Sequence, residues 1–299
     1  MIVLSLALFF AACTSEDEDA AGKGDLILYA GGGKALQEGF PYMEGDTEYA
    51  FVDGWSLQFT KYIVAFGNIE LTDPDSGKVK GSFGGPMVLD LKADGGADRE
   101  IASITGLSAV RHDLRFDVPV VDGSATNLNA DSQTVEEMIE NGYSYWIEGY
   151  ASKDERTVEF LLRLSVATHY SDCINGKDQT TGIAIENNKS IGAYIYAHAL
   201  HLFWDTLASG DEDLRFDAWA AVAGEDDYLT EEDLANQDLT DLRDENGDPL
   251  LDEDGGTVFY NDGGVLPSDQ LNLLAFVEYA ARYGVHFNGV GLCVTESLD

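Results

Sequence analysis

The chain has 299 residues, of which 44% are apolar and 11% aromatic, so it can build a substantial core and is not an intrinsically disordered protein. It carries 17 Lys and Arg against 55 Asp and Glu, which gives a formal net charge of −38. Because it has no basic surface to release counterions, we expect no nucleic-acid binding. An anionic membrane surface would repel it.

The N-terminus has the pattern of an export signal. Residues 2–12 form a largely apolar run that is too short for a transmembrane helix, which needs about 20 residues. The run suits the hydrophobic region of a signal peptide. Ala11 and Ala12 stand directly before Cys13, and together these positions resemble the lipobox of bacterial lipoproteins.

The lipobox resemblance implies where the protein resides. Residues 1–12 would be removed as a signal peptide, and Cys13 would carry lipid. Residues 13–24, acidic and rich in small side chains, would form a solvated tether. The resemblance thus implies an extracytoplasmic protein of the cell envelope that reaches a membrane through its lipid anchor alone. The alternative is a plain signal peptide with an incidental cysteine.

Strand patterns dominate residues 25–203. Glycine, aspartate and asparagine turns separate them, and Gly67 with Asn68 is expected to bulge or bend one of them. One short helix is expected near residues 132–141. Many short strands without alternating long helices predict a mainly β fold, an antiparallel sandwich or barrel. The expected strands are residues 26–30, 55–72, 88–92, 114–120, 143–151, 157–170 and 190–203.

Residues 204–299 predict a small, partly helical and acidic portion packed on the β domain. Helix patterns cover residues 212–224 and the stretch from Pro267 to Gly284, which could cap that helix. Residues 205–262 contain twenty acidic residues and two arginines. This excess fits a solvated surface adapted to a salty medium, or a segment that binds cations.

Two cysteines remain if Cys13 is lipidated. An exported chain with one remaining pair usually joins it, so we predict a disulfide between Cys173 and Cys293. This bond would fasten the middle of the chain to its C-terminal end. The alternative is two unrelated buried thiols.

Two acidic stretches are weak candidates for calcium. Residues 222–233 match half of an EF-hand, with Asp233 at position twelve, but Val222 and Gly224 replace early ligands and Asp227 replaces the invariant glycine. Residues 244–254 offer more oxygen ligands but lack the full loop spacing. The oxygen ligands of this second stretch are Asp244, Asn246, Asp248, Asp252 and Asp254.

Three of the five histidines predict a transition-metal site. His198 and His201 lie three residues apart, Asp205 follows, and His286 stands seven residues before Cys293. Imidazole nitrogen suits Zn or Cu. The site requires residues 198–205 to bend or turn helically, because residues three apart on a straight strand face opposite ways. The alternative is that these histidines are hydrogen-bonded structural residues.

The last third of the chain resembles a group of uncharacterised bacterial lipoproteins. Residues 198–205, the EF-hand-like half and residues 284–293 match them in that order. The matching stretches of those proteins carry further histidines, and Leu292 stands where another is expected. The resemblance implies a metal site of which this chain keeps a part.

Signatures of catalysis are missing from the sequence. It contains neither HExxH nor GxSxG, and its carboxylates are too numerous to single out a general acid and base. We therefore expect a binding lipoprotein with a divalent-metal site rather than an enzyme. The alternatives are a structural or adhesive surface lipoprotein without metal and, least favoured, a metal-dependent hydrolase.

Overall fold

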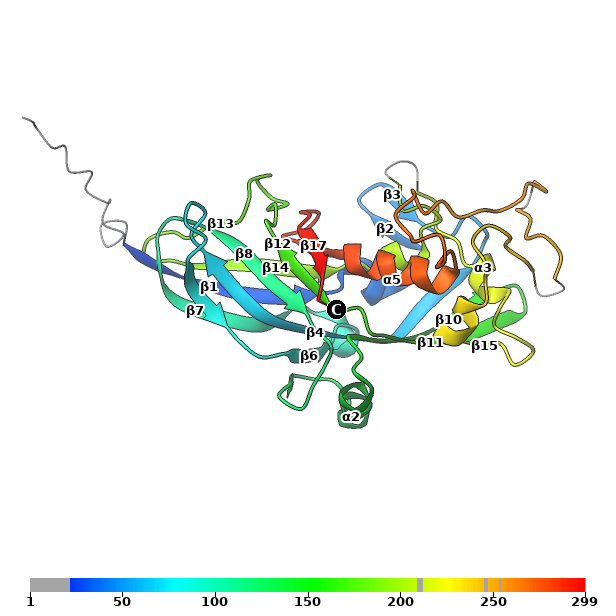
Figure 1. Ribbon diagram of the computed structural model, residues 1–299, viewed down its shortest axis with the longest axis horizontal. Helices are drawn as coiled ribbons and strands as arrows, with labels where there is room; N and C mark the ends of the chain where they lie inside the picture. Colours follow the sequence, from blue (N-terminus) through cyan, green and yellow to red (C-terminus); the bar gives the residue numbers. More distant parts are fainter. Residues whose placement is uncertain (1–21, 209–211, 245–246, 253, 299) are drawn as a thin grey trace, which may run out of the picture.

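A computed structural model describes residues 22–208, 212–244, 247–252 and 254–298 (Figure 1). The predicted signal peptide, Cys13 and most of the predicted tether lie outside the described residues. The first strand begins at Lys23, inside the stretch predicted as tether. None of the described helices has the length and apolar character needed to cross a membrane.

The smaller sheet has four strands in the order β16-β14-β1-β7. They are β16 (Val285–Phe287), β14 (Ser190–Ala197), β1 (Lys23–Gly31) and β7 (Arg99–Ser108). The central strands β1 and β14 run parallel, while the outer pairs are antiparallel. The C-terminal portion of the chain thus supplies one edge of this sheet.

The larger sheet is built on β4 (Ser56–Thr72), the longest strand, which runs through the middle of the molecule in Figure 1. Its main path is β15-β11-β10-β4-β8-β12-β17, and β5, β6, β9 and β13 pair beside this path. The other strands are β5 (Val79–Phe83), β6 (Met87–Asp90), β8 (Arg111–Val118), β9 (Thr126–Asn127), β10 (Tyr145–Lys153), β11 (Arg156–Leu164), β12 (Thr168–Ser171), β13 (Ile183–Ala184), β15 (Tyr228–Thr230) and β17 (Val294–Ser297).

The mainly β prediction is confirmed, but the sheets are mixed rather than purely antiparallel. Three pairs are parallel, namely β1 with β14, β6 with β9 and β11 with β15. Parallel pairing needs a long connection between the two strands, and the chain from β1 to β14 supplies one. The described strands do not close into a barrel. The predicted bulge is present, because the pairing of β4 with β8 shifts between Gly67 and Glu70.

The helices follow the sequence in part. Helix α2 (Ser132–Asn141) forms as predicted, with the Asp131 carboxylate accepting from the Thr134 N–H at its start. Helix α5 (Leu273–Tyr283) begins later than the predicted Pro267. The helix starts at Leu273, and the preceding Asn272 caps it by accepting a hydrogen bond from the Ala275 N–H.

The predicted helix over residues 212–224 is wrong in extent. Only α3 (Asp217–Ala220) is helical, because Leu214 is drawn into bridges with Phe51 and Trp204 instead. The remaining elements are α1 (Gly33–Glu38), α4 (Glu231–Ala235), the 3-10 turns η2 (Ala93–Gly96) and η3 (Ala199–Phe203), and a small hairpin of β2 (Tyr42–Glu44) and β3 (Thr47–Tyr49).

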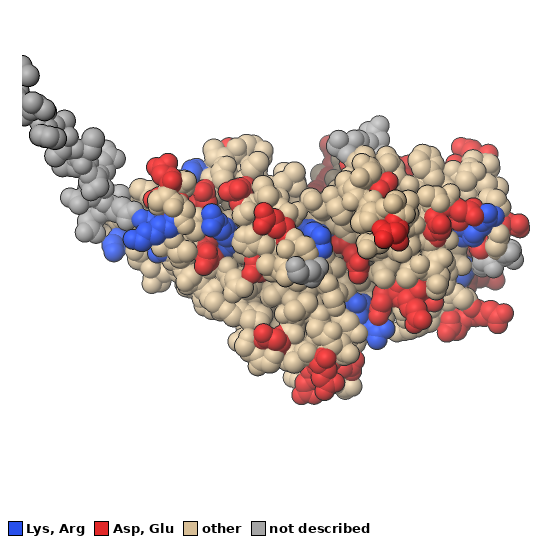
Figure 2. Space-filling view, viewed as in Figure 1, with Lys and Arg blue, Asp and Glu red and all other residues tan. Residues whose placement is uncertain are grey.

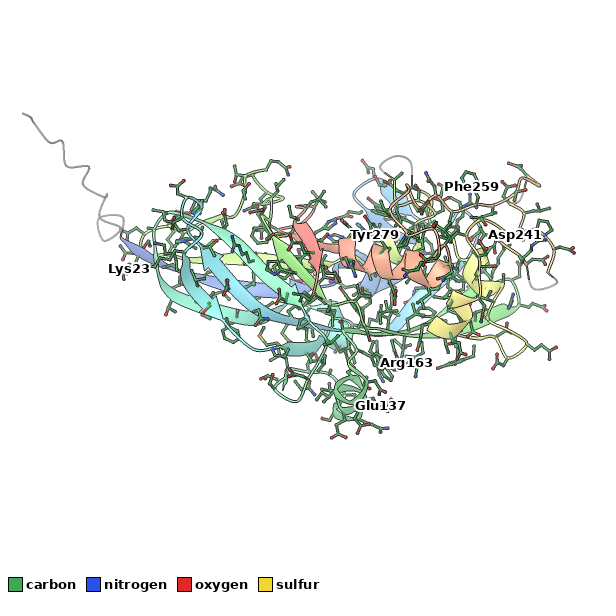
Figure 3. All side chains as sticks on the ribbon, viewed as in Figure 1. Lys23, Glu137, Arg163, Asp241, Phe259 and Tyr279 are labelled. Carbon is green, nitrogen blue, oxygen red and sulfur yellow. A yellow bond between two sulfur atoms is a disulfide. The ribbon has the colours of Figure 1, made fainter. Side chains whose placement is uncertain are left out.

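One large apolar cluster joins both parts of the chain. Leu28 and Phe59 from the strands and Trp219 and Phe276 from the C-terminal helices are all buried within it. A smaller cluster lies under α2, around Met138. On the face shown in Figure 2, acidic side chains form several separate patches and outnumber the basic ones. The side chains of Glu137 on α2 and Asp241 in the C-terminal portion lie at the outside of the molecule (Figure 3).

Candidate functional site

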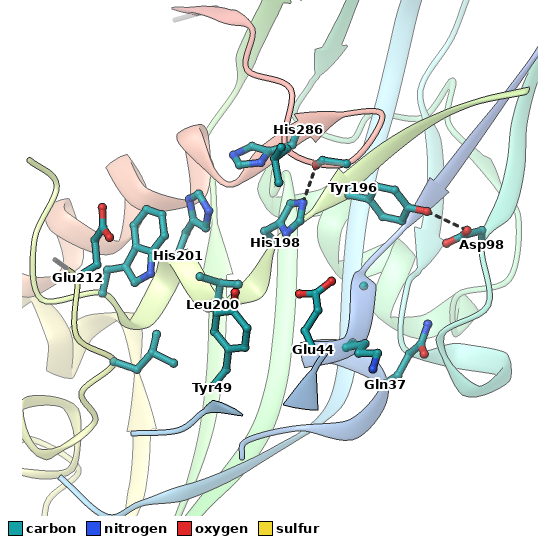
Figure 4. A pocket seen from close by; sticks show the side chains of 16 residues that line it. Gln37, Glu44, Tyr49, Asp98, Tyr196, His198, Leu200, His201, Glu212 and His286 are labelled. Atoms are coloured by element: carbon teal, nitrogen blue, oxygen red, sulfur yellow. Dashed lines mark hydrogen bonds between the residues drawn. The ribbon is translucent and has the colours of Figure 1, made fainter. Parts of the chain in front are cut away.

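His198 and His201 stand where β14 ends and the chain turns. The strand ends at Ala197, and η3 follows at once with a hydrogen bond from the His201 N–H to the His198 carbonyl oxygen at 3.2 Å. The bend that the sequence required is therefore present. It places both imidazoles toward the same cavity (Figure 4).

His286 reaches the same place from the other end of the chain. It lies on β16, which pairs antiparallel with β14 and sets His286 beside Tyr196. The ring centres are 4.6 Å apart for His198 and His286, 4.9 Å for His201 and His286, and 6.0 Å for His198 and His201. We call these three residues the histidine cluster.

Several buried ring nitrogens of the histidine cluster lack a hydrogen-bond partner among the described residues. His198 Nε2 lies 3.0 Å from the Gly289 carbonyl oxygen. By contrast, His201 Nδ1 and both nitrogens of His286 are buried without a well-aligned hydrogen-bond partner there, although the Tyr283 backbone interacts with the His286 ring and raises its pKa. Each such group destabilises the folded protein by about 1–3 kcal/mol. The alternative, that these histidines are hydrogen-bonded structural residues, predicts more hydrogen bonds than the histidine cluster forms.

Burial keeps the histidine cluster uncharged. Desolvation, together with the smaller effects of the nearby His286 and His198, lowers the pKa of His201 to about 2. Desolvation, followed by the charge of His198, lowers the pKa of His286 to about 4. Burial also lowers the pKa of His198, although Gly289 and Glu44 oppose that shift. Neutral imidazole is the form that binds metal ions.

The histidine cluster lines a cavity of about 670 Å³. Its wall includes Tyr196 from β14 and Trp204, whose ring stacks on His201 with 3.7 Å between centres. Glu44, Asp98 and Glu212 also line it. These three carboxylates cannot be identified from sequence patterns, because they come from separate loops and strands whose meeting depends on the tertiary fold.

Asp205 does not join the histidine cluster. Its carboxylate accepts a hydrogen bond from Arg215 at 3.0 Å and another from the Asp213 N–H at 3.1 Å. It is also absent from the described lining of the cavity. The physical reason is that Arg215 is 18% exposed and needs a carboxylate partner, which Asp205 provides.

The predicted disulfide between Cys173 and Cys293 is present, with 4.0 Å between the Cα atoms. It holds the chain that follows His286 against the end of β12, where the Ile174 N–H also donates to the Leu292 carbonyl oxygen. Gly291 is required here, because a Cβ atom would lie 1.9 Å from the Ile174 oxygen. Leu292 itself is 57% exposed and adds no ligand to the cavity.

The other two histidines each have one partner, although His112 Nδ1 is buried without a hydrogen-bond partner among the described residues. His169 Nδ1 lies 2.6 Å from the Asp117 carboxylate, and His112 Nε2 lies 2.9 Å from the Ser108 carbonyl oxygen. Neither belongs to the cavity lining as described. They are structural, as a lone histidine usually is.

In the EF-hand-like half, the backbone turns at Asp227 as the loop requires, but the carboxylates of Asp227 and Asp233 bind other groups of the protein. Asp227 has φ of 52°, the left-handed conformation that the invariant glycine of an EF-hand supplies, and Leu229 is fully buried. However, Asp227 forms an ion pair with Arg156 at 2.7 Å, and Asp233 accepts from the N–H and hydroxyl of Thr230. Position twelve therefore caps α4.

The second calcium candidate forms tight turns. Asp244 Oδ1 accepts from the Asp248 N–H, and Asp252 Oδ1 accepts from the N–H groups of Asp254 and Gly256. Asn246 lies outside the described residues. The Asp244 and Asp252 carboxylates are thus engaged with backbone N–H groups of their own turns.

In the described part of the chain, no three His, Cys, Asp or Glu side chains are already arranged around a common metal position. Comparison with known proteins gives no match among family models, curated proteins or solved structures.

Proposed function

We propose that the protein is an extracytoplasmic binding lipoprotein that holds a divalent transition metal, zinc or copper, on His198, His201 and His286. The observation that carries this proposal is a cluster of three neutral imidazoles, with unpartnered nitrogens, at a cavity. Asp205 has no part in the proposed site.

The spacing of the rings supports this ligand set. Imidazoles that share a tetrahedral ion, with metal–nitrogen bonds of about 2.0–2.1 Å, have ring centres roughly 5 Å apart. The measured separations of 4.6, 4.9 and 6.0 Å bracket that value. Because Nε2 of His198 contacts Gly289, its Nδ1 is the nitrogen left for a metal. Small rotations of the rings would bring the ligands together.

Metal analysis of the untagged full chain, purified in detergent, tests the metal site. We expect one zinc or copper ion per chain, with His201→Ala losing it and His169→Ala keeping it. His169 is the control because it is a histidine outside the cavity lining. Absence of stoichiometric metal after exposure to both ions would favour a structural or adhesive lipoprotein.

The proposed localisation of the protein at a membrane depends on lipidation of Cys13. Replacing it by alanine should move the protein from the membrane to the soluble extracytoplasmic fraction. Intact-mass measurement should find a lipid on the wild-type cysteine and nothing before it. An unmodified Cys13, or cleavage at another position, would contradict the anchor without affecting the proposed metal site.

A further inference from the structure

The cavity is far larger than a metal ion requires. Its volume of about 670 Å³ exceeds by more than tenfold the roughly 30 Å³ that one water molecule occupies in the liquid. A small organic molecule therefore fits beside or in place of an ion. Its chemistry can be deduced from the side chains around the cavity.

Carboxylates are spread along the length of the cavity. Glu212 lies at one end, Glu44 lies beneath His198 in the middle, and Asp98 lies at the opposite end beside Tyr196 (Figure 4). Against these three acids the lining has one lysine, Lys34, which donates to the Met43 carbonyl oxygen at 2.8 Å. With neutral imidazoles, the lining carries an excess of negative charge.

These carboxylates have free hydrogen-bonding capacity. Within the described residues, Glu44 and Glu212 show neither an ion pair nor a side-chain hydrogen bond. Asp98 accepts one bond, from the Tyr196 hydroxyl at 3.1 Å. A carboxylate has about four acceptor positions, so each can receive further donors.

The imidazoles of His286 and His201, which form the floor of the cavity between the carboxylates, also have unused hydrogen-bonding capacity. His286 is 7% exposed, lines the cavity, and has two buried ring nitrogens without a well-aligned hydrogen-bond partner among the described residues; its one interaction of this kind, with the Tyr283 backbone, leaves the other nitrogen free. His201 is 6% exposed and has one such nitrogen. A neutral imidazole accepts a hydrogen bond from an ammonium group, and an aromatic ring such as Tyr196 attracts a cation to its face.

We infer that this cavity binds a linear organic diamine or polyamine. Its ammonium groups pair with the carboxylates of Glu212, Glu44 and Asp98, and its methylene chain lies over the histidine cluster and Tyr196. Several separated charges on an apolar chain match several separated carboxylates along an aromatic and imidazole floor. The inference does not depend on the proposed metal, although the two ligands share the cavity and should compete.

Calorimetric titration of the metal-free full chain with spermidine and putrescine tests this inference. A protein of net charge −38 also attracts cations without specificity, so the titration is done at about 0.15 M salt, where exposed charges are screened beyond about 8 Å. Mg²⁺ carries the same charge as putrescine and serves as the control ligand. We expect saturable binding of one polyamine per chain that an equal concentration of Mg²⁺ does not displace.

A matched pair of variants locates the site. The double variant E44Q/D98N should weaken spermidine binding by about tenfold or more, as expected from losing charge-assisted hydrogen bonds. The control E136Q/E140Q makes the same change in charge on exposed positions of α2, away from the cavity, and should change affinity less than twofold. Glu44 and Asp98 are exposed, so their replacement leaves the core intact, and E212Q alone should weaken binding independently.

Three outcomes would overturn the inference. These are the absence of saturable polyamine binding, displacement by equal Mg²⁺, and equal weakening in E44Q/D98N and E136Q/E140Q. Zinc titration of the same preparations separates this inference from the proposed function. Zinc binding without polyamine binding refutes the inference alone, and polyamine binding without zinc refutes the metal alone.

Discussion

The histidine cluster and the acidic stretch of residues 244–254 are both rich in metal-ligand side chains, but the fold treats them in opposite ways. In the acidic stretch, Asp244 and Asp252 accept hydrogen bonds from N–H groups of their own turns. In the histidine cluster, His201 and His286 are buried, and three ring nitrogens have no partner in the described residues.

This difference shows what marks a candidate site. Aspartates next to glycines are plentiful in this chain because they close turns, which requires no ligand. Buried polar nitrogens without partners are destabilising, so the presence of three of them, on His201 and His286, at one cavity calls for a function. The number of ligand-type residues in a segment is therefore a poorer guide than their burial without partners.

Removal of the disulfide should have the largest effect on stability. It should affect the histidine cluster more than the acidic stretch of residues 244–254. Replacing Cys173 and Cys293 by serine frees a loop closed over a sequence separation of 120 residues, and we expect a loss of about 4 kcal/mol in unfolding free energy. Urea denaturation measures this loss. The histidine cluster should loosen with it, because His286 lies next to the anchored segment. A loss below about 1 kcal/mol would show that the bond does not constrain the unfolded chain.

Substitutions in the histidine cluster and in the acidic stretch should differ in their effect on the bound zinc. His286→Ala removes the cavity ligand contributed by β16, so we expect stoichiometric zinc to be lost while the circular dichroism spectrum stays unchanged. The double variant D252N/D254N in the acidic stretch should keep its zinc, since Asp252 accepts hydrogen bonds within its own turn and neither residue lines the cavity. Equal loss of zinc from both variants would remove the distinction between the regions. Plasma emission spectrometry of the dialysed proteins provides the measurement.

Acid should destabilise the metal-free protein through the histidine cluster. The pKa of His286 is lowered from 6.5 to about 4, so between these values the unfolded chain binds a proton that the folded chain does not. The stabilising effect of the neutral ring is complete above pH 6.5 and is lost as the pH falls toward 4. The difference should reach about 3 kcal/mol, at about 1.4 kcal/mol per pH unit.

The variant His286→Asn isolates this effect from the many carboxylates. Urea denaturation of both proteins between pH 7 and pH 4 should show the wild type losing more stability over that window than the variant. Parallel pH profiles would contradict the assignment of a buried, neutral His286.

Much of the fold could be predicted from local patterns. The strands β4 and β10 and the helix α2 appear near their predicted positions. The strand predicted over residues 190–203 ends at Ala197, because the chain turns there into η3. Strand β7 (Arg99–Ser108) was missed because register shifts in its pairing with β1 break the alternation of buried and exposed residues. Parallel pairing was missed because it joins distant segments and leaves no local signal.

The site could be predicted from the sequence only where its residues lie close together in the chain or belong to a rare residue type. His198 and His201 form a visible pair, and His286 stood out because histidines are rare here. Glu44 and Asp98 could not be identified, since each is one of 55 acidic residues and enters the cavity only through the tertiary arrangement. Asp205 was assigned wrongly because sequence spacing cannot show that Arg215 takes its carboxylate.

The smallest expected effect is that of calcium on the acidic stretch. A calcium ion there must displace the hydrogen bonds that Asp244 and Asp252 accept within their turns, and the exposed loop gives it little shelter from water. We therefore expect calcium at about 1 mM to raise the thermal midpoint no more than magnesium at the same concentration, through screening of the net negative charge alone. Asp252→Asn should leave this small rise unchanged. A saturable rise specific to calcium, abolished by Asp252→Asn, would instead show that the turns of this stretch open to form a true site and that both regions bind cations.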